Sequence, residues 1–188
     1  MADTRIPELW IRLERWLESS APPLLRRLNA GATEERIQFI QSELGIDLGP
    51  AVNAFYSRHD GETCLDGSDF GFHGAFFSLD RVLQEHQSLA EAALDNDENG
   101  FMVSGPIKDC LFHLLWFPLF GSDGDYVCLD FAPAAGGTRG QLIEVTHEGE
   151  RNLLASSLES WFESHVKRFE SGQISYDSIS ESLEGDDS

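Results

Sequence analysis

Apolar residues recur at the three- and four-residue spacing of amphipathic helices in five segments of the chain. The buried positions that this spacing predicts are Ile6, Leu9, Trp10, Leu13, Trp16 and Leu17; Ile37, Ile40 and Leu44; Val52, Phe55 and Tyr56; Leu79, Val82, Leu83, His86, either Leu89 or Ala90, and Ala93; and Leu158, Trp161, Phe162, His165, Val166 and Phe169. Thr4, Thr33 and either Ser156 or Ser157 are suited to cap helix N-termini, and Gly45 is suited to end a helix. We therefore expect three short helices near the start of the chain, one near the middle and one near the end.

Between the last two helices the spacing changes to the two-residue period of strands. An apolar run (111–120) ends at a turn signal rich in Gly and Asp, and a second run (125–131) follows. In the second run Tyr126, Cys128 and Asp130 alternate with Val127, Leu129 and Phe131. A loop rich in Pro, Ala and Gly (133–140) leads to a third run (141–145), and a short strand is expected at 152–155. The pattern predicts a three-stranded antiparallel core whose middle strand has one dry face.

These elements predict an α+β fold in which a mainly antiparallel sheet is flanked by helices. We assign residues 1–170 to a single domain, because the length of 188 residues fits one core. Residues 171–188 contain five acidic residues, several Ser and no Lys or Arg. We expect this segment to be a mobile acidic tail that can dock through Ile174, Tyr176 or Ile179.

The charge of the chain narrows the classes of partner. The net charge is −20, and residues 59–188 carry 6 Lys and Arg against 25 Asp and Glu. Nucleic-acid binding is excluded on this basis, because neutralising phosphates needs a basic surface. Hydrophobic residues make up 41% of the chain, which argues against disorder. No apolar run is long enough for a membrane span or a secretory signal, so we expect a cytoplasmic protein.

Motifs that would indicate a cofactor or catalysis are incomplete. Cys64, Cys110 and Cys128 have no CxxC spacing, so they predict reduced thiols. The loop that starts at Asp95 matches the first half of a calcium-binding loop, but Pro106 stands where a bidentate Glu is required. His59 and Asp60 have no nucleophile in a recognisable motif, and the glycine-rich loop 136–140 lacks the phosphate-loop pattern. We expect no cofactor, no metal site and no enzymatic activity.

Acidic residues in two loops are the candidate contact residues for a partner. Their positions are Glu62, Asp66 and Asp69 in one loop and Asp123 and Asp125 in the turn before the second strand. One interpretation is a solvated turn whose charges discourage strand pairing. The other is a negative recognition face made of both loops. The sequence leaves open whether the two loops are neighbours.

The order of motifs along the chain resembles the cell-wall assembly regulator (Smi/Knr) family of the SUKH superfamily. The residues that carry the resemblance are Trp10, Leu13 and Glu14; Gly31, Ala32 and Thr33; Ile37; Glu43, Leu44 and Gly45; Phe55 and Tyr56; His59, Asp60 and Gly61; Trp116 and Pro118; Gly124, Asp125 and Tyr126; Asp130 and Pro133; and Gly137 to Ile143. The chain departs from the family pattern at Gly49, which separates a Leu and a Pro that are more commonly adjacent.

The resemblance implies a non-catalytic binding protein. Members of the superfamily are immunity proteins that neutralise secreted bacterial toxins, often nucleases, or regulators of cell-wall synthesis in fungi. An acidic chain is compatible with the first role, because a nuclease presents a cationic surface. We therefore expect a protein partner, a cationic toxin domain, and keep as the alternative a regulatory scaffold that binds an endogenous partner. The sequence leaves the oligomeric state open.

Overall fold

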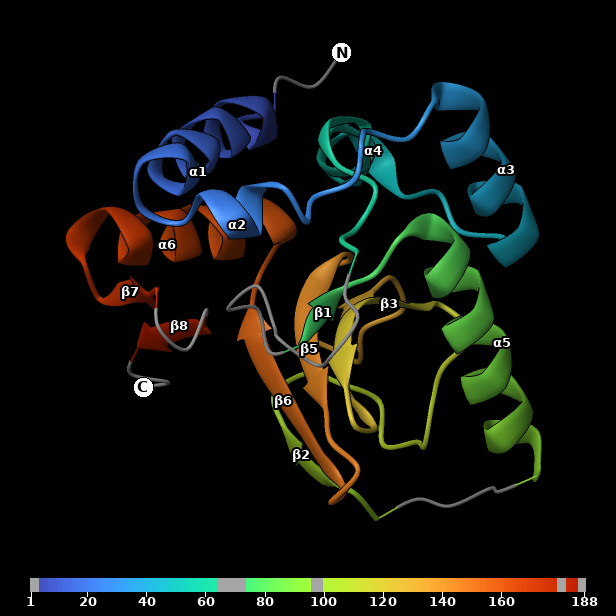
Figure 1. Cartoon of the computed structure of the whole chain (residues 1–188). Coiled ribbons are helices and arrows are strands. Elements are labelled where there is room, and N and C mark those ends of the chain that lie inside the picture. Colours follow the sequence, from blue (N-terminus) through green and yellow to red (C-terminus); the bar gives the residue numbers. More distant parts are fainter. Residues whose placement is uncertain (1–3, 64–73, 96–99, 179–181, 186–188) are drawn as a thin grey trace.

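The computed structural model of the chain describes residues 4–63, 74–95, 100–178 and 182–185. Its helices are α1 (Ile6–Ser20), α2 (Pro22–Leu25), α3 (Glu34–Leu44), α4 (Gly49–Arg58), α5 (Leu79–Asp95) and α6 (Leu158–Ser171). Its strands are β1 (Ala75–Phe76), β2 (Met102–Ser104), β3 (Trp116–Ser122), β4 (Asp125–Asp130), β5 (Gln141–Val145), β6 (Glu150–Ala155), β7 (Ile174–Asp177) and β8 (Ser182–Gly185). Figure 1 shows the helices gathered around one end and one side of the main sheet.

The main sheet has the strand order β1-β3-β4-β5-β6-β2. Its neighbours are antiparallel except for β2, which runs parallel to β6. The predicted α+β class and the predicted antiparallel core are confirmed, since β3, β4 and β5 are consecutive in the sheet. The parallel strand β2 was not predicted, because three residues are too short a run for a period to be read.

The predicted helix boundaries are largely confirmed by their caps. Thr33 accepts a hydrogen bond from Arg36 N, and Ser157, rather than Ser156, caps α6. Thr4 accepts a hydrogen bond from Ile6 N, the first amide of α1, at 3.3 Å, although Arg5 and not Thr4 occupies the N-cap position. The Thr4 hydroxyl also donates to Glu159 Oε2 at 2.8 Å, which ties the start of α1 to α6.

Strand β4 is buried on both faces, so the prediction of a single dry face was wrong. Val127 and Leu129 pack in the larger core with α1, α4 and α6. Cys128, which points the other way, packs in a second core with Phe112 and with Leu89 of α5. The segment before β3 and the second half of α5 supply this second layer, which the alternation along β4 alone did not indicate.

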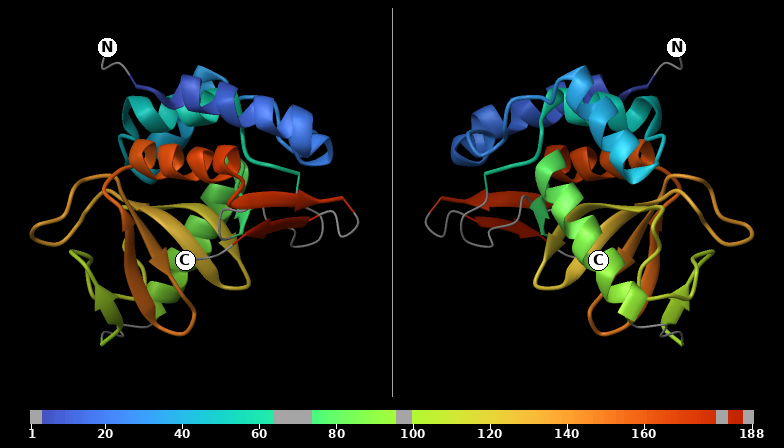
Figure 2. Two further views of the ribbon diagram at one scale, coloured as in Figure 1. Left: turned by 90° about the vertical axis from the view of Figure 1, so that its left-hand side faces the viewer. Right: turned by 90° about the vertical axis from the view of Figure 1, so that its right-hand side faces the viewer.

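Aromatic rings fill the larger core around Trp10 of α1. The Trp10 ring centroid lies 4.9 Å from that of Phe55 in α4 and 4.8 Å from that of Phe162 in α6. Helices α1 and α6 therefore lie side by side over one end of the sheet (Figure 2). Ion pairs at the surface join the same two helices, from Arg5 to Glu163 at 2.6 Å and from Arg12 to Glu170 at 2.6 Å.

The chain continues beyond α6 into a separate two-stranded sheet of β7 and β8. Ile174 is buried in the larger core, and Tyr176 is partly buried against it. Docking of the tail through these two residues is thereby confirmed, whereas Ile179 lies outside the described residues. The domain boundary at residue 170 stays a prediction.

Removing the Phe55 ring should destabilise the protein strongly. Phe55 is fully buried between Trp10 and Phe162, so Phe55→Ala is expected to lower the free energy of unfolding by about 3–5 kcal/mol. The matched control is Phe39→Ala, because the Phe39 side chain on α3 is 46% exposed. Urea unfolding followed by tryptophan fluorescence measures both variants. Equal losses in the two would contradict the packing described for α1, α4 and α6.

Candidate functional site

The outer edge of β1 is closed by Glu62, one of the predicted contact residues. Phe77 N donates to Leu119 O of β3 at 3.1 Å, so the backbone groups of the preceding residue, Phe76, face away from β3. Glu62 N donates to Phe76 O at 2.9 Å, and Phe76 N donates to Glu62 Oε1 at 2.8 Å. Glu62 is only 9% exposed, so its carboxylate caps the sheet edge and offers little surface to a partner.

Two adjoining hollows lie beside this edge. Glu62 lines the larger one, of about 410 Å³, and Asp123 lines the smaller one, of about 110 Å³. The residues that line both are Phe77, Arg81, Gly121 and Ser122. Glu62 and Asp123, which belong to different acidic loops, therefore lie at one surface. Asp66 and Asp69 lie outside the described residues.

The cation that lines both hollows is already neutralised. Arg81 forms an ion pair with Glu85 one turn further along α5, and its guanidinium lies 5.9 Å from the centre of the Phe77 ring. Tyr126 donates from its hydroxyl to Glu85 Oε2 at 2.8 Å. Burial, together with this hydrogen bond to a carboxylate, raises the pKa of Tyr126. Among the described residues that line the hollows, there is therefore neither a cation without an ion pair nor an ionised phenol.

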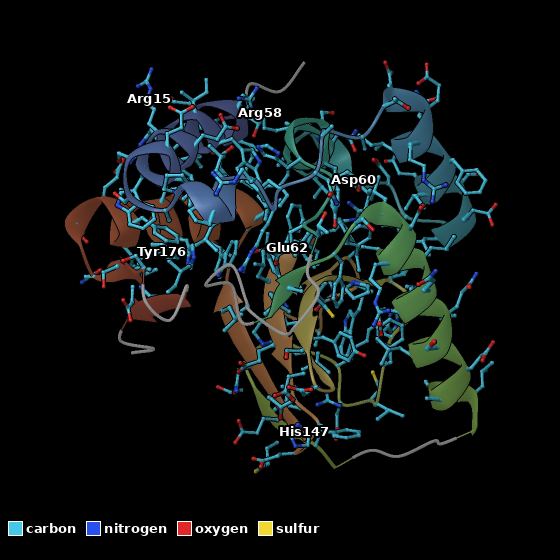
Figure 3. The ribbon with its side chains drawn as sticks, in the orientation of Figure 1. Arg15, Arg58, Asp60, Glu62, His147 and Tyr176 are labelled. Atoms are coloured by element: carbon cyan, nitrogen blue, oxygen red, sulfur yellow. The ribbon has the colours of Figure 1, made fainter. Side chains whose placement is uncertain are left out.

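Asp125 and His147 join the two turns at the far end of the sheet. Asp125 Oδ1 lies 2.8 Å from both the backbone N and the ring Nδ1 of His147. Figure 3 places His147 at the end of the sheet remote from α1, α4 and α6. Burial alone would raise the pKa of Asp125, but the bonds from His147 and its charge lower it below its ordinary value. The same hydrogen bond and charge pair raise the pKa of His147.

Asp123 is the most exposed of the described contact candidates at this end. It has φ 50°, a left-handed conformation that Asp and Asn tolerate better than other side chains. The Ser122 hydroxyl donates to Asp123 Oδ2 at 3.2 Å. Glu148, in the neighbouring turn, is also exposed. Asp123, Asp125 and Glu148 thus belong to two turns that the Asp125–His147 bonds hold together, and we name these three residues the acidic end.

Sequence reasoning missed a second acidic group on the strands next to these turns. Glu144 of β5 is the register partner of Asn152 of β6. The Asn152 amide donates to Glu144 Oε2 at 3.1 Å and to Glu150 Oε2 at 3.4 Å. Neither Glu forms an ion pair with a residue in the part of the chain that the structure describes. The alternation along β6 could have predicted part of this group, because residues 150 and 152 share one face of the strand.

The family-like motif residues of β4 and β5 have a structural role. Asp130 is fully buried and accepts hydrogen bonds from Ala132 N at 2.9 Å and from the Gln141 amide at 3.0 Å. Gln141 also accepts from Thr138 N at 3.1 Å, and Gly140 N donates to Asp130 O at 2.7 Å. Burial raises the pKa of Asp130 against these bonds. The network holds the loop 133–140 against the sheet.

The other chemical candidates form no recognisable centre among the described residues. His59 bridges Glu14 Oε1 and Asn29 O, each at 2.8 Å, and its ring packs edge-on against Trp10. No group of three or more His, Cys, Asp or Glu within the described ranges is placed to hold a metal ion. None of the described helices combines the length and the apolar character needed to cross a bilayer.

Removing the charge of Asp125 should lower the pKa of His147 toward its ordinary value. The His147 pKa is raised by Asp125, so the ion pair exists below the folded pKa of His147 and is lost as pH rises through it. The variant Asp125→Asn keeps an acceptor oxygen and removes the charge. NMR titration of the imidazole signals measures the effect. His113 is the internal control, because burial and then Lys108 hold its pKa below the ordinary value; equal shifts at both would contradict the assignment.

Comparison with known proteins agrees with the fold and with the motif residues. Residues 31–164 match the model of the SMI1/KNR4 family (SUKH-1). The chain is 25% identical over 216 residues to KNR4/SMI1 homolog 2 of Debaryomyces hansenii, covering 92% of this chain and 37% of that protein. It is 27% identical over 155 residues to the Schizosaccharomyces pombe protein named cell wall biosynthesis/cell cycle regulator smi1, covering 73% of this chain and 31% of that protein. The chain spans about a third of the length of these curated relatives.

The family match covers the greater part of the chain, from the turn before α3 to the middle of α6. It includes Trp116, Asp130 and Gln141, which build the joint between β3, β4 and β5. The resemblance noted in the sequence is therefore confirmed, and the chain belongs to the SMI1/KNR4 family (SUKH-1).

Proposed function

We propose that this chain is a non-catalytic immunity protein that neutralises a secreted bacterial toxin by binding a cationic domain of it. The acidic end carries the proposal: Asp123, Asp125 and Glu148 lie in two turns held together by the Asp125–His147 bonds, in a chain of net charge −20. Asp123 and Asp125 are the proposed contact residues. Asp66 and Asp69 keep the role predicted for them, and Glu62 belongs at the margin of the surface.

The physical basis is electrostatic steering. A toxin that acts on nucleic acid needs a cationic surface to hold phosphate. A strongly acidic protein raises the rate of encounter with such a surface and, once bound, occludes it. No cofactor enters this mechanism. The proposed site of action is the cytoplasm, where an incoming toxin would meet its target.

A regulatory scaffold that binds an endogenous partner is the second candidate. The name of the Schizosaccharomyces pombe relative, cell wall biosynthesis/cell cycle regulator smi1, favours it. The match covers 31% of that protein, so the role in its name is carried to this chain only as a proposal. Gene neighbourhood separates the two candidates, because an immunity protein is expected beside the gene of a large toxin.

Binding to the product of the neighbouring upstream gene should be tight and should weaken with salt. The double variant Asp123→Asn, Asp125→Asn is expected to weaken binding by roughly tenfold at low salt, about 0.7 kcal/mol for each charge removed. Asn keeps the left-handed turn at position 123 and the acceptor at position 125. Isothermal titration at two ionic strengths measures both effects.

The matched control removes the same number of negative charges from another part of the surface. Glu18→Gln with Glu43→Gln removes two exposed carboxylates on α1 and α3, far in the chain from the acidic end. This variant should bind as the wild type does apart from a small uniform loss. Equal losses in the two double variants would rule out the acidic end as the contact. Absence of binding to the upstream gene product would favour the scaffold.

A further inference from the structure

The two edges of the main sheet differ in how their backbone groups are used. At β1, the outward N–H and C=O of Phe76 are bonded to Glu62. At the opposite edge, β2 forms the margin of the sheet beyond β6 (Figure 2). An edge strand with open backbone groups is a template for strand addition. The β2 edge is therefore the place to look for main-chain recognition of a partner.

The register of β2 on β6 determines which groups are open. Met102 pairs with Glu150, and Met102 N donates to Gly149 O at 2.9 Å. In this parallel register Met102 and Ser104 direct their backbone groups to β6, and Val103 directs its N–H and C=O away from the sheet. Within the described residues, no hydrogen bond reaches either group of Val103.

Asp109 sets the length of the open edge on one side. Its carboxylate accepts from Phe101 N at 2.9 Å, so the outward donor two residues before Val103 is occupied. On the other side, Gly105 O accepts from Ile107 N at 3.0 Å. The open segment is thus short and centred on Val103. An added strand would form two backbone hydrogen bonds there, one with the N–H and one with the C=O of Val103. Its side chains must therefore supply the remaining affinity.

The side chains beside this edge indicate the charge of the incoming strand. Met102 is 60% exposed and shares a sheet face with Glu150, its register partner on β6. Glu150 and Glu144 share the amide of Asn152 and have no cation among the described residues. A long basic side chain on a strand next to β2 can extend across Met102 to these carboxylates, with its stem on the apolar side chain.

We propose that the β2 edge binds an extended basic segment of the partner protein, which pairs with Val103 and places Lys or Arg against Glu144 and Glu150. The inference rests on the proposed function in that the partner is cationic. A second copy of this chain is the alternative occupant of an open edge. With a net charge of −20 on each copy, repulsion opposes that pairing.

A synthetic probe tests the edge without the natural partner. The probe is a short blocked peptide of alternating Lys and Val, and the readout is amide hydrogen exchange of the whole protein by NMR. Exchange at Val103 N–H should slow about tenfold when nine-tenths of the protein is occupied. Exchange at Ser104 N–H, which already faces β6, should change little. Slowing at Ser104 alone, or at neither amide, would overturn the proposal.

Introducing a positive or a negative charge at position 102 tests whether the bound segment is basic. Met102→Lys and Met102→Glu both remove the exposed thioether, so loss of apolar contact is common to them. The Lys variant should bind the probe at least about fivefold more weakly than the Glu variant, since it repels the basic side chains. A peptide of alternating Glu and Val should not bind the wild type. Equal binding by the two variants, tight binding of the acidic peptide, or self-association through Val103 would each overturn the proposal.

The toxin complex separates failure of this inference from failure of the proposed function. If the upstream gene product binds in a salt-sensitive way and leaves Val103 exchange unchanged, the strand-edge inference is wrong and the immunity role stands. If that product does not bind but the basic probe protects Val103, the edge is confirmed and the immunity role fails.

Discussion

Burial of β4 on both faces is the constraint on which the rest of the structure depends. Val127 and Leu129 face the layer of α1, α4 and α6, and Cys128 faces the layer formed by α5 and the segment before β3. A strand enclosed in this way has no surface to offer, so polar chemistry is confined to the ends and edges of the sheet. The buried carboxylate that β4 does carry, Asp130, is held by Ala132 N and the Gln141 amide and serves the fold.

The fold could be predicted from the sequence where the hydrophobic periodicity continued over several helical turns or along a whole strand. The buried stripes of α1 and α6 and the alternation of β4 determined the helices and the antiparallel core. Two features escaped because they depend on long-range pairing. The strand β2 exists through its register with Arg151 of β6, and the second core forms because α5 turns Leu89 and Ala93 toward Cys128. The buried stripe of α5 was predicted from its helical spacing, but no local pattern in the sequence names the strand on which β2 or that stripe packs.

The candidate site was predictable in composition and only partly in geometry. Acids at turn positions were evident, and the structure does bring Glu62 and Asp123 to adjoining hollows. Sequence patterns could not reveal that the Glu62 carboxylate is hydrogen-bonded to the edge of β1, because a loop sequence does not distinguish a capping carboxylate from a solvated one. They also could not show that Glu144 and Glu150 converge on one amide, since the convergence requires the register between β5 and β6.

The position of Trp10 bears on what counts as a folding unit in this chain. The family match begins at residue 31, after α1 has ended, yet Trp10 packs against both Phe55 and Phe162 of the matched region. A polypeptide cut at the start of the match would leave these two rings, both fully buried in the intact chain, open to water. The start of the family match therefore falls inside the hydrophobic core, and we expect a fragment that folds cooperatively to extend back through α1.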